Sequence, residues 1–72
     1  MGNFDRFPPR LRYLREKRRM SQKALGELCG LGKTSIGQYE RGEKVPSLVT
    51  LIELADIFDV SVDYLVGRKN KF

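Results

Sequence analysis

Apolar residues recur along this chain at the three- and four-residue spacing of amphipathic helices, and no run shows the sustained apolar–polar alternation of a strand. Helix-starting prolines and serines and helix-ending glycines divide this pattern into short segments. The predicted helices span residues 9 to 17 or 18, 22–29, 33–41, 48–58 and 62–66, with Ser21, Ser47 and Ser61 as N-caps of the second, fourth and fifth. We therefore expect an all-α fold of five short helices.

The connection between the second and third predicted helices is typical of a helix-turn-helix, in which a short turn sets two helices at a steep angle. Gly30 can adopt the positive φ that ends the first of these helices, and Leu31 is placed to plug the turn. Gly26 is expected to let the two helices approach closely, and Ile36 to anchor the second in the core. Each feature is common alone, but their combination at offsets of 4, 8, 9 and 14 residues from Gln22 is specific.

The charge of the chain is distributed unevenly. Residues 1–44 carry 11 basic and 5 acidic side chains, a net charge of +6, whereas residues 45–66 carry four acidic side chains and no basic one. The last residues, 67–72, add three positive charges. A basic half next to an acidic half favours a polyanionic partner for the basic half. The alternative, from charge alone, is a solvated surface with a chance excess of Lys and Arg.

Composition excludes several classes of function. The chain has no His and one Cys, so imidazole catalysis, His metal sites, an internal disulfide and Cys-based zinc sites are excluded. No apolar run approaches the roughly 18–20 residues of a membrane span, and the first residues lack the apolar stretch of a signal peptide. One unpaired thiol fits a reducing cytoplasm. We expect a cytoplasmic protein that is not an enzyme and binds no metal, cofactor or membrane.

Six runs carry a family resemblance: MSQ at 20–22, GLGKTSI at 30–36, YERG at 39–42, PSL at 46–48, LAD at 54–56 and VSVDYLVG at 60–67. Together they resemble the Cro/C1-type (XRE-family) helix-turn-helix transcriptional regulators, over about residues 10–67. The resemblance implies a five-helix, lambda-repressor-like DNA-binding domain. We expect this domain at residues 9–67, with a flexible N-terminal arm at 1–8 and a basic C-terminal tail at 68–72.

The resemblance also implies roles for the polar residues around the predicted helix 33–41, which would enter the major groove. Lys33, Thr34 and Gln38 would face base edges. Gln22 would contact a phosphate and brace this recognition helix. The remaining phosphate contacts would come from Ser35, Arg41 and Lys44.

The chemistry of the residues agrees with these implied roles. In a helix over 33–41, a polar face that includes Lys33, Gln38 and Arg41 lies opposite Ile36 and Tyr39. Lys can donate to guanine, Gln can pair with adenine, and the methyl group of Thr suits thymine. The alternative is that this face is merely solvated.

Two glycines depart from the family pattern. Gly32 stands where a Ser or Thr cap is usual, and Gly37 stands where a DNA-facing side chain is common. Together they weaken the recognition helix by about 1 kcal/mol or more. They also leave fewer groups to read bases, which predicts modest sequence specificity.

Arg15 and Glu40 each place a charge on an otherwise apolar helix face. Matching positions of the family form an ion pair, so we expect Arg15 and Glu40 to pair between the first and third helices. The alternative is that both side chains extend to solvent.

The predicted helix 48–58 is apolar around more than half of its circumference, which is more than one core should absorb. We expect the surplus to form a two-fold symmetric homodimer interface, with Val49, Phe58, Val62, Tyr64 and Val66 as its contacts. A dimer would place two recognition helices in successive major grooves of a pseudo-palindromic operator. The alternative is a central helix wrapped by the other four.

These features together predict a sequence-specific, double-stranded-DNA-binding transcriptional regulator that represses by occupying an operator. The second hypothesis is a protein-interaction module of the same fold, an antitoxin or coactivator-type adaptor that reads DNA weakly or not at all. Gly37 and the sparse recognition face leave this hypothesis open.

Overall fold

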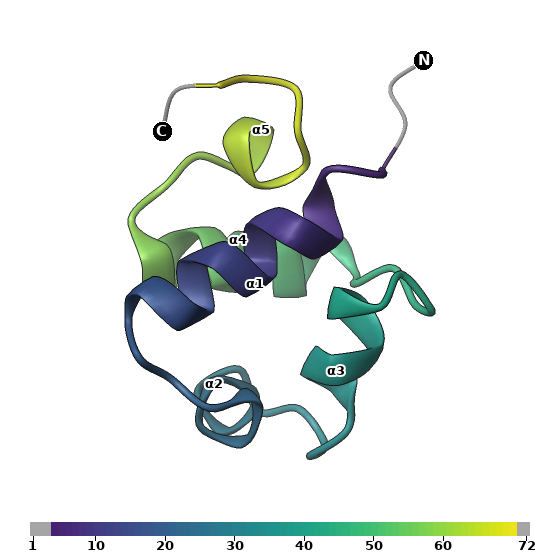
Figure 1. The fold of residues 1–72 in the computed structure, drawn as a ribbon, viewed down its shortest axis with the longest axis vertical. Helices are drawn as coiled ribbons and strands as arrows, with labels where there is room; N and C mark the ends of the chain where they lie inside the picture. The colour runs from purple at the N-terminus through teal and green to yellow at the C-terminus, as the bar shows by residue number, and fades with distance from the viewer. Residues whose placement is uncertain (1–3, 71–72) are drawn as a thin grey trace.

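The computed structural model describes residues 4–70, which contain five helices and no strand (Figure 1). The helices are α1 (Phe7–Lys17), α2 (Gln22–Leu28), α3 (Ser35–Glu40), α4 (Leu48–Phe58) and α5 (Val62–Leu65). This confirms the predicted all-α class and the order of the elements. Within this part of the chain, no helix has the length and apolar character needed to cross a membrane.

In Figure 1, α2 and α3 lie below α1 and α4, and α5 lies above them. Helix α1 contacts both α3 and α5, so it joins the helix-turn-helix to the C-terminal part of the domain. All five helices contribute to one core. Its largest fully buried side chains are Phe7, Leu11, Leu25, Ile36, Leu54 and Leu65.

Three helices begin at the predicted serine caps. The hydroxyl oxygens of Ser21, Ser47 and Ser61 each accept a hydrogen bond from the backbone N–H three residues later. Each cap satisfies one of the amide groups that a helix start leaves without a partner. The boundaries of α2, α4 and α5 at their N-terminal ends are therefore set by local sequence.

Helix α3 is shorter than the predicted helix 33–41. Residues 33 and 34 form a turn, and the N–H of Ser35 donates to the carbonyl oxygen of Gly32 at 3.2 Å. The side chain of Thr34, the residue before the helix, caps no amide of the described chain. Gly32 has no side chain that could cap a longer helix, so regular helix starts only at Ser35.

The N-terminal boundary also differs from the prediction. Helix α1 begins at Phe7, and Phe7 is fully buried, so residues 7 and 8 belong to the domain and not to a flexible arm. The ring of Phe7 lies 4.7 Å from that of Phe4 and 6.3 Å from that of Tyr39, measured between centroids. Phe7 precedes Leu11 by four residues, so it extends the buried stripe of α1 by one turn. Residues 1–3 of the expected arm lie outside the described residues.

The expected basic tail is anchored to α1 where the structure describes it. Arg10 donates hydrogen bonds to the carbonyl oxygens of Tyr64 and Lys69, and its guanidinium lies 4.2 Å from the centroid of the Tyr64 ring. It also donates to the side chain of Asn70 at 3.1 Å. Residues 71 and 72 lie outside the described part of the chain.

Two of the expected dimer contacts are wrong, because Phe58 and Tyr64 are buried in the core of the monomer. Val62 and Val66 are partly buried against the same core, and only Val49 is largely exposed. Helix α5 covers the end of α4, which a helical projection of α4 alone cannot reveal. The surplus of apolar surface is real, but it lies at the other end of α4 and in the loop before it, on Val45, Leu48, Val49 and Ile52. We call these four residues the α4 ridge.

Phe7→Ala should lower the free energy of unfolding by about 3–5 kcal/mol, because it removes a fully buried ring between α1 and α3. That loss matches the whole stability expected of so small a domain, about 3–5 kcal/mol, so Phe7→Leu provides a milder test at about 1 kcal/mol. The control is Tyr13→Ala, since the Tyr13 side chain is 51% exposed. Urea titration followed by circular dichroism measures all three variants. Equal midpoints for Phe7→Leu, Tyr13→Ala and the parent would contradict the assignment of Phe7 to the core.

Candidate nucleic-acid interface

The turn between α2 and α3 has the features predicted for a helix-turn-helix. Gly30 adopts a φ of +66°, and the N–H of Leu31 donates to the carbonyl oxygen of Gly26 at 2.8 Å, which closes the end of α2. Leu31 packs against the core from beneath the turn, and Ile36 is fully buried. The predicted roles of Gly30, Leu31 and Ile36 are confirmed.

The expectation for Gly26 is wrong in one respect. A Cβ atom at Gly26 would lie 3.5 Å from the carbonyl oxygen of Gly32 and 3.7 Å from Cγ1 of Ile36, which are ordinary van der Waals distances. The helices therefore pass each other with room for a methyl group. Close approach alone does not require glycine at this position.

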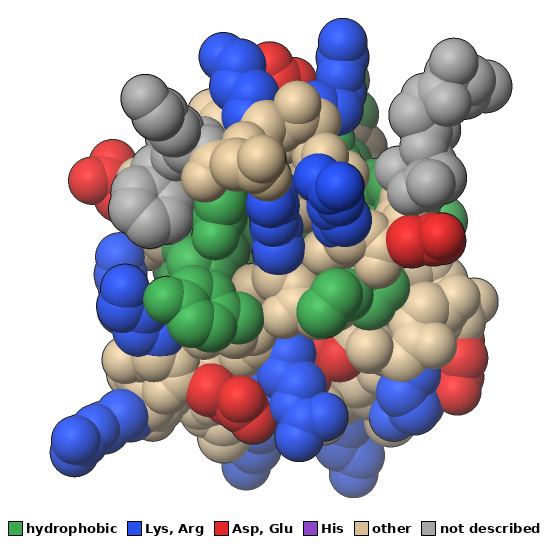
Figure 2. Space-filling model, turned by 45° about the horizontal axis from the view of Figure 1, so that its top comes forward, with side chains coloured by type: hydrophobic (Ala, Val, Ile, Leu, Met, Phe, Trp, Pro, Cys, Tyr) green, Lys and Arg blue, Asp and Glu red, His purple; other side chains and the backbone are tan. Residues whose placement is uncertain are grey.

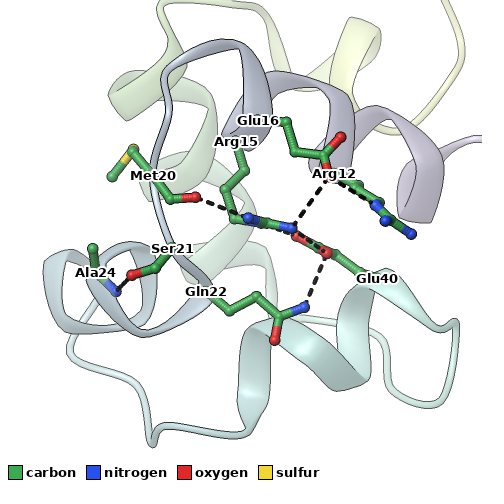
Figure 3. Close-up of polar contacts among 8 residues, drawn as sticks. All are labelled: Arg12, Arg15, Glu16, Met20, Ser21, Gln22, Ala24 and Glu40. Atoms are coloured by element: carbon green, nitrogen blue, oxygen red, sulfur yellow. Dashed lines mark hydrogen bonds and ion pairs between the residues drawn. The ribbon is translucent and has the colours of Figure 1, made fainter.

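A buried polar network fixes α3 to α1 and α2 (Figure 3). Arg15 Nε and Nη2 donate to the two carboxylate oxygens of Glu40 at 2.6 and 3.0 Å, and Arg15 Nη1 donates to the carbonyl oxygen of Met20 at 2.8 Å. Gln22 Nε2 donates to Glu40 Oε1 at 3.1 Å. The predicted ion pair is present, and its side chains are only 12% and 5% exposed. The hydrogen bond to Glu40 raises the pKa of the Arg15 guanidinium above its ordinary value.

This network gives Gln22 the bracing role that the resemblance implies. Its amide joins the first turn of α2 to the last residue of α3 through Glu40. The side chain is partly buried and lies where α2 begins. The phosphate contact expected of Gln22 stays a prediction.

The other predicted DNA contacts lie in the turn before α3, on α3 and in the loop after it. Lys33 and Thr34 are exposed in the turn, and Ser35 and Gln38 are partly exposed on α3. The two basic residues after the helix, Arg41 and Lys44, are also exposed. The segment thus presents polar and basic groups outward while Ile36 and Tyr39 hold it to the core.

The structure adds one residue that the sequence analysis did not consider, Glu43. Arg41 Nε and Nη2 donate to the two carboxylate oxygens of Glu43 at 2.8 and 3.2 Å. The hydrogen bond from Arg41 lowers the pKa of the Glu43 carboxyl below its ordinary value. The only signal in the sequence was the pair of opposite charges two residues apart.

Positive charge is not confined to the region of α3. Figure 2, which brings the α5 side of the molecule forward, shows Lys and Arg side chains on this face as well, with hydrophobic patches between them. Several arginines counted in the basic half serve the fold itself. Arg18, for example, donates to the carbonyl oxygens of Ile57 and Phe58 at the end of α4.

A five-helix domain with a braced helix-turn-helix is the architecture of Cro/C1-type DNA-binding domains. A family model described as helix-turn-helix matches residues 11–65. The chain therefore belongs to this helix-turn-helix family, as the resemblance in its sequence predicts.

Similar proteins of Bacillus subtilis (strain 168) include two HTH-type transcriptional regulators. The uncharacterized regulator YobD is 45% identical over 58 residues, which cover 81% of this chain and 52% of that protein. The regulator AnsR is 40% identical over 62 residues, which cover 86% of this chain and 53% of that protein. This chain thus spans about half the length of these relatives.

Solved structures show the same fold. The P22 c2 repressor, in complex with a synthetic operator, superimposes with a TM-score of 0.82 at 33% identity, and the match covers 88% of this chain and 96% of that one. The restriction-modification controller protein C.AhdI from Aeromonas hydrophila gives a TM-score of 0.76 at 38% identity, over 83% of this chain and 91% of its own. The lambda-repressor-like fold is therefore established.

Glu40→Ala should lower the free energy of unfolding by about 3 kcal/mol, because it leaves the Arg15 guanidinium buried without its main partner. The matched control is Glu16→Ala, which removes an exposed carboxylate 4.0 Å from the same guanidinium and should cost less than about 0.5 kcal/mol. Thermal melting at neutral pH compares the two variants. If Glu40→Ala melts within a degree of the parent, the network does not hold α3 in place.

Proposed function

We propose that this chain is a sequence-specific, double-stranded-DNA-binding repressor that acts by occupying an operator. The observation that carries this proposal is the buried Arg15–Glu40 pair, which holds a short helix rigidly while polar groups on and around it face outward. Reading base edges needs such preorganisation, because a helix that must be ordered on binding loses affinity to that ordering. The P22 c2 repressor, a relative in fold and sequence, is seen with operator DNA.

In this proposal the outward-facing groups divide into two sets. Lys33, Thr34 and Gln38 face base edges in the major groove, where their donors, acceptors and methyl group can distinguish bases. Gln22, Ser35 and Lys44 flank that set and hold phosphates, which positions the helix without reading sequence. The chain acts in the cytoplasm, and it acts by binding and not by catalysis.

The α4 ridge supports a homodimer as the binding species. Leu48, Val49 and Ile52 share one face of α4, and Val45 lies in the loop just before it. The side chains of Val45, Leu48 and Val49 are each more than 65% exposed. A second copy of the chain, related by a two-fold axis, can cover this ridge with its own. The two recognition helices would then reach half-sites about 34 Å apart on a pseudo-palindromic operator.

The α4 ridge also keeps a second candidate function in view. A protein partner in place of a second copy would make the chain an adaptor of the antitoxin or coactivator type. One structural relative, at 27% identity and a TM-score of 0.77, is the SinR protein in complex with the SinI protein. Weak binding to every duplex tested, with tight binding of a protein on the ridge, would favour the adaptor.

Gln38→Ala should flatten the preference at one base pair, whereas Lys44→Ala should weaken binding to all duplexes alike. In the parent, the slope of log K against log salt should lie between about −3 and −6 per subunit. Lys44→Ala should make this slope shallower by about 1, because one fewer counterion is released. Fluorescence anisotropy with duplexes selected from a random pool, at several salt concentrations, measures both effects. If both variants lower affinity uniformly, the division between reading and positioning residues is wrong.

Substituting Val49 and Ile52 together by Ser should abolish cooperative binding to a symmetric operator, because it removes the centre of the α4 ridge. The control is Leu28→Ser, which changes an apolar side chain of similar exposure, 61%, on α2. Analytical ultracentrifugation of the protein–duplex complex gives the stoichiometry. One parent subunit saturating a symmetric operator, with no cooperativity, would refute the dimer.

A further inference from the structure

The missing side chain of Gly37 leaves a space on α3 that two neighbouring side chains occupy. A Cβ atom at Gly37 would lie 3.0 Å from Nη1 of Arg41 and 3.2 Å from Oε1 of Gln22. Arg41 therefore does not extend away from the domain after α3 ends. Its side chain folds back toward the preceding turn, the direction that helix geometry favours, and its guanidinium lies over the backbone of Gly37.

Glu43 fixes the guanidinium in that place through one of its edges. The hydrogen bonds from Nε and Nη2 to the carboxylate of Glu43 occupy the lateral edge of the planar guanidinium. Within residues 4–70, Nη1 has no acceptor, so the end formed by Nη1 and Nη2 keeps its donors. Two parallel N–H donors on this end are the group that pairs with O6 and N7 of guanine in the major groove.

We propose that Arg41 is a specificity-determining residue that reads a guanine through the space left by Gly37, with Glu43 as the positioning residue. The inference rests on the proposed binding mode, in which α3 enters the major groove. It replaces the phosphate contact that the family resemblance implies for Arg41.

The charge of Glu43 favours a base over a phosphate as the partner of Arg41. A phosphate drawn to Arg41 would meet the Glu43 carboxylate within the same pair, and two anions repel each other. At a G·C base pair the neighbour of the guanine acceptors is the amino group of cytosine, which donates a hydrogen bond that a carboxylate can accept. The Arg41–Glu43 pair thus matches a G·C edge on both sides.

The inference gives Gly37 a definite purpose. A Cβ atom at residue 37 would displace the end of the Arg41 side chain and would require Oε1 of Gln22 to shift by a few tenths of an ångström. Gln22 can make this small shift while its Nε2 stays bonded to Glu40, so the fold tolerates Ala. Gly37→Ala should leave the melting temperature unchanged or raise it, because Ala is the better helix former. It should nevertheless move the guanidinium and lose the preference for guanine.

The experiment starts from duplexes that the wild-type chain selects from a random pool, followed by anisotropy titrations with each G·C pair changed to A·T in turn. One such change should cost the wild type about tenfold or more in affinity. Arg41→Lys keeps the charge but lacks the fork, so it should lose that discrimination while its salt slope stays the same. Gly37→Ala and Glu43→Gln should each reduce or abolish the difference in affinity between the G·C and A·T duplexes.

The matched control is Arg12→Lys, since Arg12 forms another exposed Arg–Glu pair, with Glu16 at 3.1 Å, on α1. This variant should discriminate as the wild type does. If Arg41→Lys keeps the preference, or if Arg41→Ala weakens all duplexes equally and reduces the salt slope by about 1, Arg41 is a phosphate contact and the inference is wrong. A wild-type chain that selects no duplex overturns the proposed function itself, and this inference with it.

Discussion

The buried pair of Arg15 and Glu40 is the interaction on which the geometry of the domain depends. Helix α3 has six residues, and a helix of that length is unstable in isolation. Its place is set by what it packs against: Ile36 and Tyr39 in the core, and Glu40 held by Arg15. Burying two charges is costly, and an apolar pair of similar size often serves stability as well. The ion pair instead supplies direction, because hydrogen bonds from two nitrogens fix the angle of the carboxylate as well as its distance.

Using arginine in this way changes how the charge of the chain should be interpreted. The basic half defined by sequence contains 11 Lys and Arg residues, but Arg10, Arg15 and Arg18 direct their donors at carbonyl oxygens or a buried carboxylate of the domain itself. Net charge therefore overstates the number of cations available to a polyanion. The cations that remain for the proposed contact with DNA are those that end in solvent around α3, such as Lys33 and Lys44. Their contribution depends on salt, whereas that of the internal arginines depends on burial.

The family resemblance implied one tertiary contact, the Arg15–Glu40 pair. Otherwise the sequence predicted what local chemistry decides and missed what tertiary packing decides. Ser21 and Gly30 act within a few residues of their own position, so their caps and turns follow from the sequence. Phe7 was assigned to the N-terminal arm because the two prolines after it suggested a later helix start. Its burial depends on Tyr39, which packs against it from α3 and is 32 positions away in the sequence. Tyr64 was assigned to a dimer interface for a similar reason. Helices α1 and α4 pack against α5 and bury this side chain, and the sequence of α5 alone does not reveal that contact.

Gly37 shows how a recognition helix can differ from the pattern of its own sequence. A helical projection treats residue 37 as an empty reading position, and it treats Arg41 as a separate position on the same polar face. The structure joins the two, because a side chain that starts one turn later folds back over the glycine. The group presented at position 37 then comes from position 41, and its orientation comes from Glu43. In the proposed binding mode, a role transferred residue by residue from the family changes where a glycine lets a neighbouring side chain take its place, because the group that faces the base then comes from another position.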